Sequence, residues 1–395
     1  MTEAADHHRH SSGLAALRGL AALVVVLCHC LTAVNVAPEH ASALRVALAA
    51  LNGSACVTLF FVLSGAVLAI SFERDVRKNP RQIFGYWIRR GFRLYPLLWL
   101  AALMAAIFQL AIGAGQHLAF VSEWAHSQYQ VAPDALPFEW AKNALAVTSS
   151  LNSPAWSIKV EIIGSLLFPL LFAISQHRKA APVTVVALVI AMFSLSNPRL
   201  TAYMNVFTCS FLVGALITRW GGSFGTWFWT RSRPPRVLFT GLSVFVFLTG
   251  RTLLGDPSFV PPLAVLLEMT SAAFIVCIVL HGPPIRWFEW KSIRFLGEIS
   301  YSVYLLHMII IFVLLHTLGS TSLAPTHNWS VVEIGEFMFV VLLFTVPVAW
   351  ITFLGVEQPM QLLGRWLDQR ITGGIRGGTR PLSSGMRAAQ PFRLP

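Results

Sequence analysis

Ten apolar runs of about twenty residues divide this chain, and they constrain its fold more than any other feature. Their approximate ranges are 14–36, 46–72, 94–113, 154–175, 181–197, 200–218, 236–251, 260–280, 295–317 and 332–355. A helix that rises ~1.5 Å per residue needs about twenty apolar residues to cross the ~30 Å hydrocarbon layer of a bilayer. The sequence therefore predicts an all-α, polytopic membrane protein with about ten transmembrane helices.

The composition agrees with this class. Of the 395 residues, 55% are hydrophobic and only 12% are charged, whereas about a quarter of the residues of a soluble domain are charged. The net charge of +12 does not point to a nucleic-acid partner, because the basic residues lie in short loops between the apolar runs. That placement is typical of membrane topology.

Basic residues concentrate in alternate loops. One set of loops contains Arg74, Arg77, Lys78, Arg81, Arg89, Arg90, Arg93, Arg178, Lys179, Arg219, Arg231, Arg233, Arg236, Arg286, Lys291 and Arg294, and the arginine-bearing tail follows on the same side. The opposite set contains Arg45, Lys142, Arg199 and Arg251. Since basic loops stay on the cytoplasmic side and the number of spans is even, both termini are predicted to be cytoplasmic. The longest outer segment, 114–153, is expected to form a lid or an interfacial helix.

The cysteines predict neither a disulfide framework nor a metal site. All five lie inside apolar runs and lack paired ligand spacing. Cys28 and Cys30 flank His29, but successive side chains on a helix point ~100° apart and cannot converge on one ion. No metal is therefore expected.

The first candidate site is the pair Arg18 and His29 in the first apolar run. Eleven residues on a helix bring His29 to within ~20° of the direction of Arg18, about 16 Å further along the axis. Both therefore occupy one stripe, which must face protein or a wet cavity rather than lipid. A neutral imidazole there is a suitable general base, and the alternative is a histidine that only bonds a neighbouring helix.

Two further motifs place charge at membrane depth. In the segment that begins Pro154-Ala155-Trp156-Ser157, Ser157 and Glu161 share one helix face. Glu161 either is neutralised by Lys159, or orients a histidine or binds a sugar hydroxyl. Arg90 and Arg93, predicted at the cytoplasmic start of the third span, are spaced to hold one phosphate-bearing ligand, although flanking arginines are usually topology determinants.

The ninth run carries a polar track. Tyr304 and His307 follow Ser300 by four and seven residues, so the three side chains share one helix face. A role in packing alone would require a separate partner for each of them inside the membrane. A substrate or cofactor passage is therefore favoured. Glu268 is a further buried acid without an assigned role. Glu357, at the inner end of the tenth run, is expected to pair with an inner-loop arginine.

Taken together, these residues resemble acyltransferase family 3, the bacterial membrane acyltransferases that modify hydroxyls of sugars and other acceptors. The matching patterns are Arg18 with His29; Phe60-Phe61-Val62-Leu63-Ser64-Gly65; Arg90-x-x-Arg93-Leu94-Tyr95-Pro96; Trp156-Ser157-Ile158-x-x-Glu161; Gly297-x-Ile299-Ser300-Tyr301-Ser302-Val303-Tyr304-Leu305-x-His307; and Glu357-x-Pro359. The resemblance implies ten transmembrane helices, acyl-CoA bound from the cytoplasm, and catalysis by His29 and Arg18.

Two departures from the family pattern are visible. The family commonly has an acidic residue just before its arginine, whereas Ala15-Ala16-Leu17 precedes Arg18 here, so Arg18 needs another partner. Aromatic residues often follow the family's glutamate, but Ile162-Ile163-Gly164-Ser165 follows Glu161, which would reshape the acceptor pocket. We expect a cytoplasmic segment at 1–11, a transmembrane acyltransferase domain at 12–362 and a flexible basic cytoplasmic tail at 363–395.

The resemblance therefore implies transfer of a short acyl group, most often acetyl in this family, from acyl-CoA to a hydroxyl of a saccharide, glycolipid or small molecule. His29 would act as base, Arg18 or Tyr304 would stabilise the oxyanion, and Glu161 would join them in catalysis. Arg90, Arg93, Ser300, Tyr304 and His307 would bind the donor, and Trp156 and Ser157 the acceptor. The expected location is the bacterial cytoplasmic membrane, with no prediction of oligomeric state.

Two other classes remain open at this point. A proton-coupled transporter would use His29, Glu161, Glu268 and His307 as a proton path. It predicts an inverted repeat with paired broken helices, and the sequence contains none. A catalytically inactive scaffold is the third possibility, because of the two departures.

Overall fold

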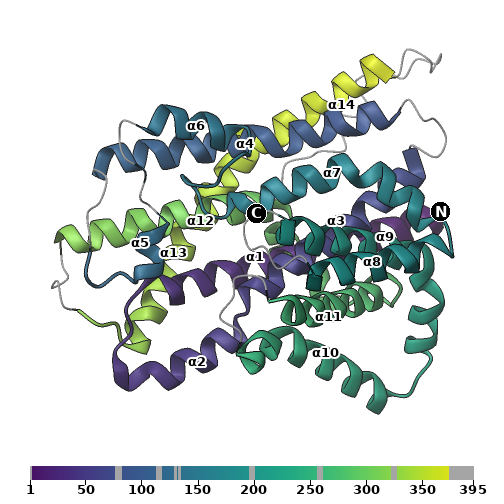
Figure 1. Ribbon diagram of the computed structural model, residues 1–395, viewed down its shortest axis with the longest axis horizontal. Coiled ribbons are helices and arrows are strands. Elements are labelled where there is room, and N and C mark those ends of the chain that lie inside the picture. Colours follow the sequence, from purple (N-terminus) through teal and green to yellow (C-terminus); the bar gives the residue numbers. More distant parts are fainter. Residues whose placement is uncertain are drawn as a thin grey trace.

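The fold is helical throughout the described part of the chain (Figure 1). The structure is a computed structural model, and it describes residues 2–75, 82–112, 118–128, 131, 135–194, 201–255, 261–321 and 327–372. Within these residues the only β-type pairings are two isolated bridges, Val34 with Val121 and Val36 with Trp329. The predicted all-α class is confirmed.

The helices follow the predicted apolar runs. In chain order they are α1 (Thr2–Ala33), η1 (Pro38–His40), α2 (Ala41–Ala50), α3 (Gly53–Asp75), α4 (Gln82–Ile112), α5 (Glu123–Ser127), α6 (Leu136–Ala144), α7 (Ala155–Ser175), α8 (Ala180–Ser194), α9 (Thr201–Trp229), α10 (Arg233–Leu254), α11 (Pro262–Leu280), η3 (Arg286–Glu289), α12 (Lys291–Thr321), α13 (Val331–Thr352), η4 (Phe353–Glu357) and α14 (Gln358–Thr372).

Eight helical segments of the described residues are long and apolar enough to cross a membrane. They are Ser12–Ala33, Pro38–Arg74, Gln82–Ala111, Ala155–Ser175, Arg233–Leu254, Pro262–Leu280, Lys291–Gly319 and Val331–Thr372. The shorter apolar helix α8 and the 29-residue α9 occupy the other two predicted runs. The protein is thus a multi-pass membrane protein.

Several helix ends differ from the predicted ones. Helix α4 begins at Gln82, about three turns before the predicted third span. Helix α1 begins at Thr2, within the predicted segment 1–11. The predicted tail from 363 begins inside α14, which continues to Thr372, and residues 373–395 lie outside the described part. A π-helical turn, η4, joins α13 to α14 without interrupting the helical path.

Helix α7 begins deep in the bundle rather than at its edge. The side-chain amide of Asn152, just before α7, donates to the carbonyl of Leu305 at 2.8 Å. Leu305 lies near the midpoint of the 31-residue α12, so α7 begins beside the middle of that helix. The buried Asn152, which bonds a carbonyl of another helix, allows the chain to enter at that depth without an unsatisfied amide donor.

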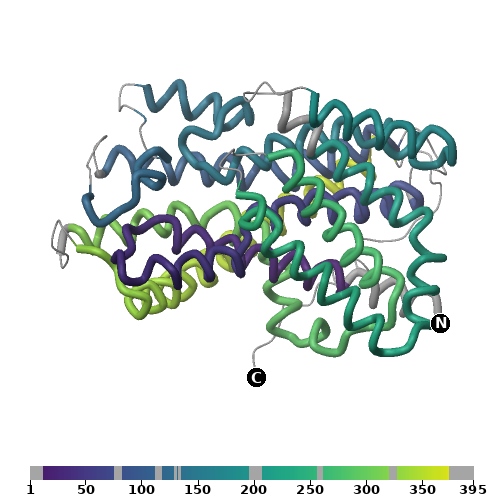
Figure 2. Tube along the Cα trace, turned by 60° about the horizontal axis from the view of Figure 1, so that its bottom comes forward, coloured from purple at the N-terminus to yellow at the C-terminus, as the bar shows by residue number. Residues whose placement is uncertain are grey.

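Helices α1 and α12 cross the middle of the bundle side by side (Figure 2). They touch at Gly19 and Gly297: a Cβ added to Gly19 would lie 2.6 Å from the Gly297 nitrogen, and a Cβ on Gly297 would lie 2.5 Å from the Ala15 carbonyl oxygen. Ten residues later on both helices, His29 meets His307. The equal intervals show that the two helices run parallel.

A second pair of helices approaches equally closely. Gly65 of α3 and Gly214 of α9 leave no room for a side chain, because a Cβ at either position would collide with backbone atoms of the opposite helix. Small residues of this kind allow membrane helices to pack by close van der Waals contact. Together these contacts hold α1, α3, α9 and α12 in the core.

We predict that Gly297→Ala destabilises the protein by about 1–3 kcal/mol, the usual cost of forcing extra volume into a packed core. The new methyl group would press on backbone atoms, which cannot rotate away. Gly335→Ala is the matched control, since nothing lies within 4 Å of a Cβ at that position of α13. Denaturation midpoints of the detergent-solubilised variants test this, and equal midpoints would contradict the proposed close packing.

Candidate active site

A cavity lies between α1, α3, α4, α7 and α12. The volume that the centres of water molecules can occupy in it is about 90 Å³. Since a single water needs roughly 10–15 Å³ by this measure, the cavity has room for several waters. Its apolar wall includes Phe60, Phe61 and Leu94. Its polar lining consists of Arg18, Ser64, Arg90, Arg93, Ser157, Glu161, Ser300, Tyr301 and Tyr304. All the site residues predicted from sequence line this cavity except His29, His307 and Trp156.

One wall of the cavity is an ion pair between α4 and α7. The Arg90 guanidinium donates to the Glu161 carboxylate and, through Nε, to the Ser165 hydroxyl at 3.1 Å. The Ser64 hydroxyl of α3 donates to the same carboxylate, 2.9 and 3.0 Å from its two oxygens. Lys159, the partner considered from sequence, instead donates to the Val147 carbonyl. The interpretation that Lys159 neutralises Glu161 is wrong.

The antiparallel packing of α4 and α7 explains this pairing. The Tyr86 hydroxyl donates to the Ser165 carbonyl at 3.1 Å, and one turn along each helix Arg90 meets Glu161. Because α4 begins at Gln82, Arg90 lies two turns inside the helix rather than at its start.

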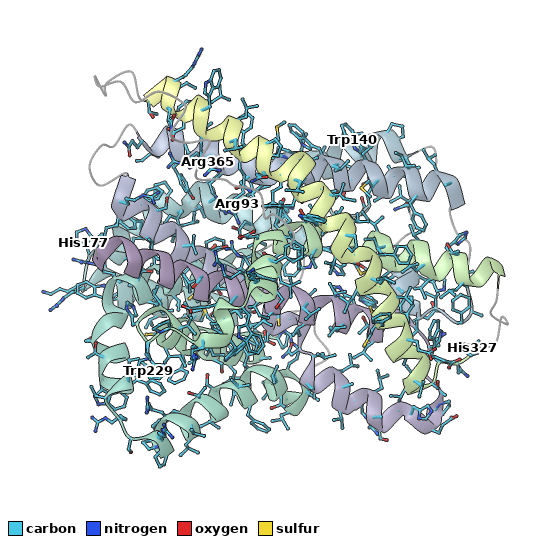
Figure 3. All side chains as sticks on the ribbon, turned by 180° about the vertical axis from the view of Figure 1, so that it is seen from behind. Arg93, Trp140, His177, Trp229, His327 and Arg365 are labelled. Atoms are coloured by element: carbon cyan, nitrogen blue, oxygen red, sulfur yellow. The ribbon has the colours of Figure 1, made fainter. Side chains whose placement is uncertain are left out.

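The other two arginines of the cavity are available to a ligand. Within the described residues, the guanidinium groups of Arg18 and Arg93 make no hydrogen bond or salt bridge, although both interact electrostatically with Glu357 and Glu161. Figure 3 shows Arg93 toward the middle of the molecule. The lining thus contains three guanidinium groups and one carboxylate, so the cavity favours an anionic ligand.

Glu357 lies behind the cavity wall and is almost completely buried. Its carboxylate accepts hydrogen bonds from the Ser302 hydroxyl at 2.9 Å and the Gln361 amide at 3.0 Å. Its electrostatic partners include Arg93, one of the inner-loop arginines expected from sequence, and also Arg18. Glu357 therefore supplies the acidic neighbour that the residues before Arg18 lack.

Two histidines from α1 and α12 lie beyond the cavity. Nδ1 of His29 is 2.7 Å from Nε2 of His307, and the two rings lie edge to edge in nearly one plane, with centroids 5.0 Å apart. One face of His29 stacks on Trp124 of α5, with a centroid distance of 5.4 Å. His307 is fully buried, and its Nδ1 is 2.7 Å from the Tyr304 carbonyl.

Tyr304 joins the cavity to the histidines. The Ser157 hydroxyl donates to its phenol oxygen at 2.8 Å, and its ring centroid is 5.9 Å from that of His307. Tyr304 lines the cavity on one side, and its ring contacts His307 on the other. It therefore lies between the cavity and the histidine pair.

The remaining predicted residues take other positions. The Ser300 hydroxyl lines the cavity while donating to the Gly297 carbonyl. Trp156 packs against Phe61 and Phe207 instead of lining the cavity. Among the described residues, no three His, Cys, Asp or Glu side chains lie close enough to hold a metal ion.

Glu268 belongs to a separate polar cluster. Its carboxylate accepts hydrogen bonds from Arg251 of α10, with Nε at 2.9 Å, and from Asn52 and Thr58 at 3.3 Å. Glu268 itself is completely buried. The cluster connects α10 and α11 to the start of α3, so its carboxylate is satisfied by structural partners.

Comparison with known proteins gives the class. The sequence profile described as an acyltransferase domain matches residues 12–355, and the protein belongs to acyltransferase family 3. It is therefore a multi-pass membrane acyltransferase, and the group that it transfers is not an aminoacyl group.

A curated relative supports this class. The chain is 27% identical over 384 residues to the acyltransferase MdmB of Streptomyces mycarofaciens, an alignment that covers 89% of this chain and 92% of the relative. No solved structure gave a significant match.

We predict that Glu161→Gln destabilises the protein by about 3 kcal/mol, the lower end of the cost of breaking a buried ion pair, because Arg90 lines the cavity and is not completely buried. Both side chains of the pair are only 13% exposed. Lys159→Gln, two residues earlier, is expected to change stability by less than about 1 kcal/mol. Chemical denaturation in detergent measures both, and equal effects would contradict a structural role for this pair.

Proposed function

We propose that this protein transfers a short acyl group, with acetyl the expected one, from acyl-CoA to a hydroxyl group of a saccharide, glycolipid or small hydrophobic molecule. The proposed location is the bacterial cytoplasmic membrane, with the arginine-lined cavity open toward the cytoplasm. The observation that carries the proposal is the cavity itself, in which guanidinium groups outnumber carboxylates and Tyr304 leads to a pair of histidines.

The arginines support an acyl-CoA donor. Guanidinium groups bind phosphate through paired, charge-assisted hydrogen bonds. Within the described residues, the guanidinium N–H groups of Arg18 and Arg93 make no hydrogen bonds and line the cavity. Arg18 and His29 are eleven residues apart on α1, which is about 16 Å along the axis. That separation suits a donor whose phosphates lie at one end of a long arm and whose thioester lies at the other.

The same separation assigns different roles to Arg18 and His29. Arg18 is too far along α1 to stabilise an oxyanion formed beside His29, although both share one helix. Tyr304 lies against the histidine pair, and its phenol is the better candidate for stabilising negative charge on the carbonyl oxygen. We assign Arg18 to donor binding, together with Arg93.

In the proposed step His29 acts first as a base and then as an acid. Nε2 of His29 takes the proton of the acceptor hydroxyl while the oxygen forms a bond to the thioester carbonyl carbon. The carbon–sulfur bond then breaks, and the departing CoA thiolate takes the proton back from His29. The products are an ester and free CoA thiol, and the histidine returns to its neutral form.

Trp124 supports an acceptor that arrives from the side opposite to the arginines. Its indole stacks on His29 and is still 37% exposed. An exposed aromatic face beside a general base is a suitable surface for the apolar face of a sugar or lipid-linked ring. A proton-coupled transporter is not favoured, because Glu268 is bonded within a separate cluster.

We predict that His29→Gln lowers transfer by about 10²–10⁴-fold, the usual contribution of a general base. The assay uses purified protein, radiolabelled acetyl-CoA, and glucose, N-acetylglucosamine and octyl glucoside as hydroxyl probes, with release of free CoA thiol as a second readout. His316→Gln on α12, whose ring contacts Phe108, is the control and is expected to retain wild-type transfer. Wild-type transfer by folded His29→Gln protein would remove the proposed base.

We predict that Arg93→Gln raises the KM for acetyl-CoA by about 10–100-fold, since one charge-assisted hydrogen bond contributes roughly 1.5–3 kcal/mol. S-acetyl-pantetheine lacks the phosphates, so its KM is expected to be the same for wild type and variant. An equal loss with both donors would contradict phosphate binding by Arg93.

A further inference from the structure

His307 has both ring nitrogens engaged inside the protein. Nδ1 faces the Tyr304 carbonyl oxygen at 2.7 Å, and Nε2 faces Nδ1 of His29 at 2.7 Å. The side chain is completely buried. Neither nitrogen is left to contact a donor, so the ligand-binding role predicted from the sequence does not suit this residue.

The carbonyl partner determines the tautomer of His307. A carbonyl oxygen only accepts hydrogen bonds, so Nδ1 of His307 must carry the proton. In the neutral ring Nε2 then has a lone pair and accepts. The alternative, a doubly protonated His307, would place a charge in a fully buried ring that has no carboxylate bonded to it among the described residues.

The tautomer of His29 follows from that of His307. Because Nε2 of His307 accepts, Nδ1 of His29 must donate and therefore carries the proton. Nε2 of His29 is then unprotonated, and within the described residues it has no hydrogen-bond partner. The nitrogen left free is the one that can take a proton from a hydroxyl group.

We propose that His307 is the positioning residue that holds His29 in the reactive tautomer, through consecutive hydrogen bonds that link the Tyr304 carbonyl, the His307 imidazole and the His29 imidazole. This inference rests on the proposed function, in which His29 is the base. The interaction strengthens when His29 becomes an imidazolium, because its Nδ1–H then donates from a charged ring. The two rings lie in nearly one plane, with an angle of 6° between them, which suits a hydrogen bond between in-plane ring nitrogens.

His307→Gln and His307→Met provide a matched test. The two side chains have similar length and volume, but only the glutamine offers an oxygen that accepts a hydrogen bond from Nδ1 of His29. We expect His307→Gln to keep kcat within about 10-fold of wild type and His307→Met to lose about 100-fold or more, as general bases do in the wrong tautomer. The KM for acetyl-CoA should stay unchanged in both variants.

A second measurement does not depend on activity. In ¹⁵N-histidine-labelled protein, with signals assigned by comparison with His29→Gln, the wild type should show a protonated Nδ1 and an unprotonated Nε2 on His29. His307→Met should show a mixture of both tautomers, and His307→Gln should resemble the wild type. This readout remains valid if acetyl-CoA is not the donor, so failure of the proposed function and failure of this inference are distinguishable.

Three outcomes would overturn the inference. One is an equal kcat for folded His307→Met and His307→Gln, which would indicate a packing role only. Another is a raised KM for acetyl-CoA with unchanged kcat, which would return His307 to donor binding. The last is a protonated Nε2 on His29 in the labelled wild-type protein.

Discussion

The close approach of α1 and α12 at Gly19 and Gly297 is the contact on which the rest of the site depends. Since neither residue has a side chain, the two parallel helices meet through backbone atoms, and their relative register is fixed at that point. Ten residues along both helices, about 15 Å at ~1.5 Å per residue, the same register brings His29 against His307. A helix contact thus determines the geometry of a chemical group that lies far from it.

Charge inside the membrane is tolerated because each acid is shared by several donors. Glu161 receives bonds from Arg90 and Ser64, while Glu357 receives bonds from Ser302 and Gln361 and lies near two arginines. These carboxylates compensate only part of the positive charge around the cavity. The remaining positive charge has no carboxylate to neutralise it, and this gives the cavity its preference for anions.

Sequence periodicity predicted the helices well, because apolar length alone decides whether a segment can cross a bilayer. It also placed Arg18 and His29 on one stripe, since both belong to one helix. It could not pair His29 with His307, which are 278 residues apart. Nor could it identify Arg90, 71 residues away, as the partner of Glu161, because Lys159 was the only basic side chain within local reach. The early start of α4 and the deep start of α7 follow from contacts between helices, which local patterns do not report.

The surroundings of His29 have a consequence for selectivity. One face of the imidazole is covered by Trp124, and the ring edge that carries Nδ1 is closed by His307. The lone pair of Nε2 lies in the ring plane, so the oxygen of an incoming alcohol must approach within that plane, beside the indole. Alcohols on short projecting arms can meet that requirement, whereas those flanked by bulky substituents cannot. Regioselectivity would then arise from one flat wall and one closed edge, without recognition of the acceptor as a whole.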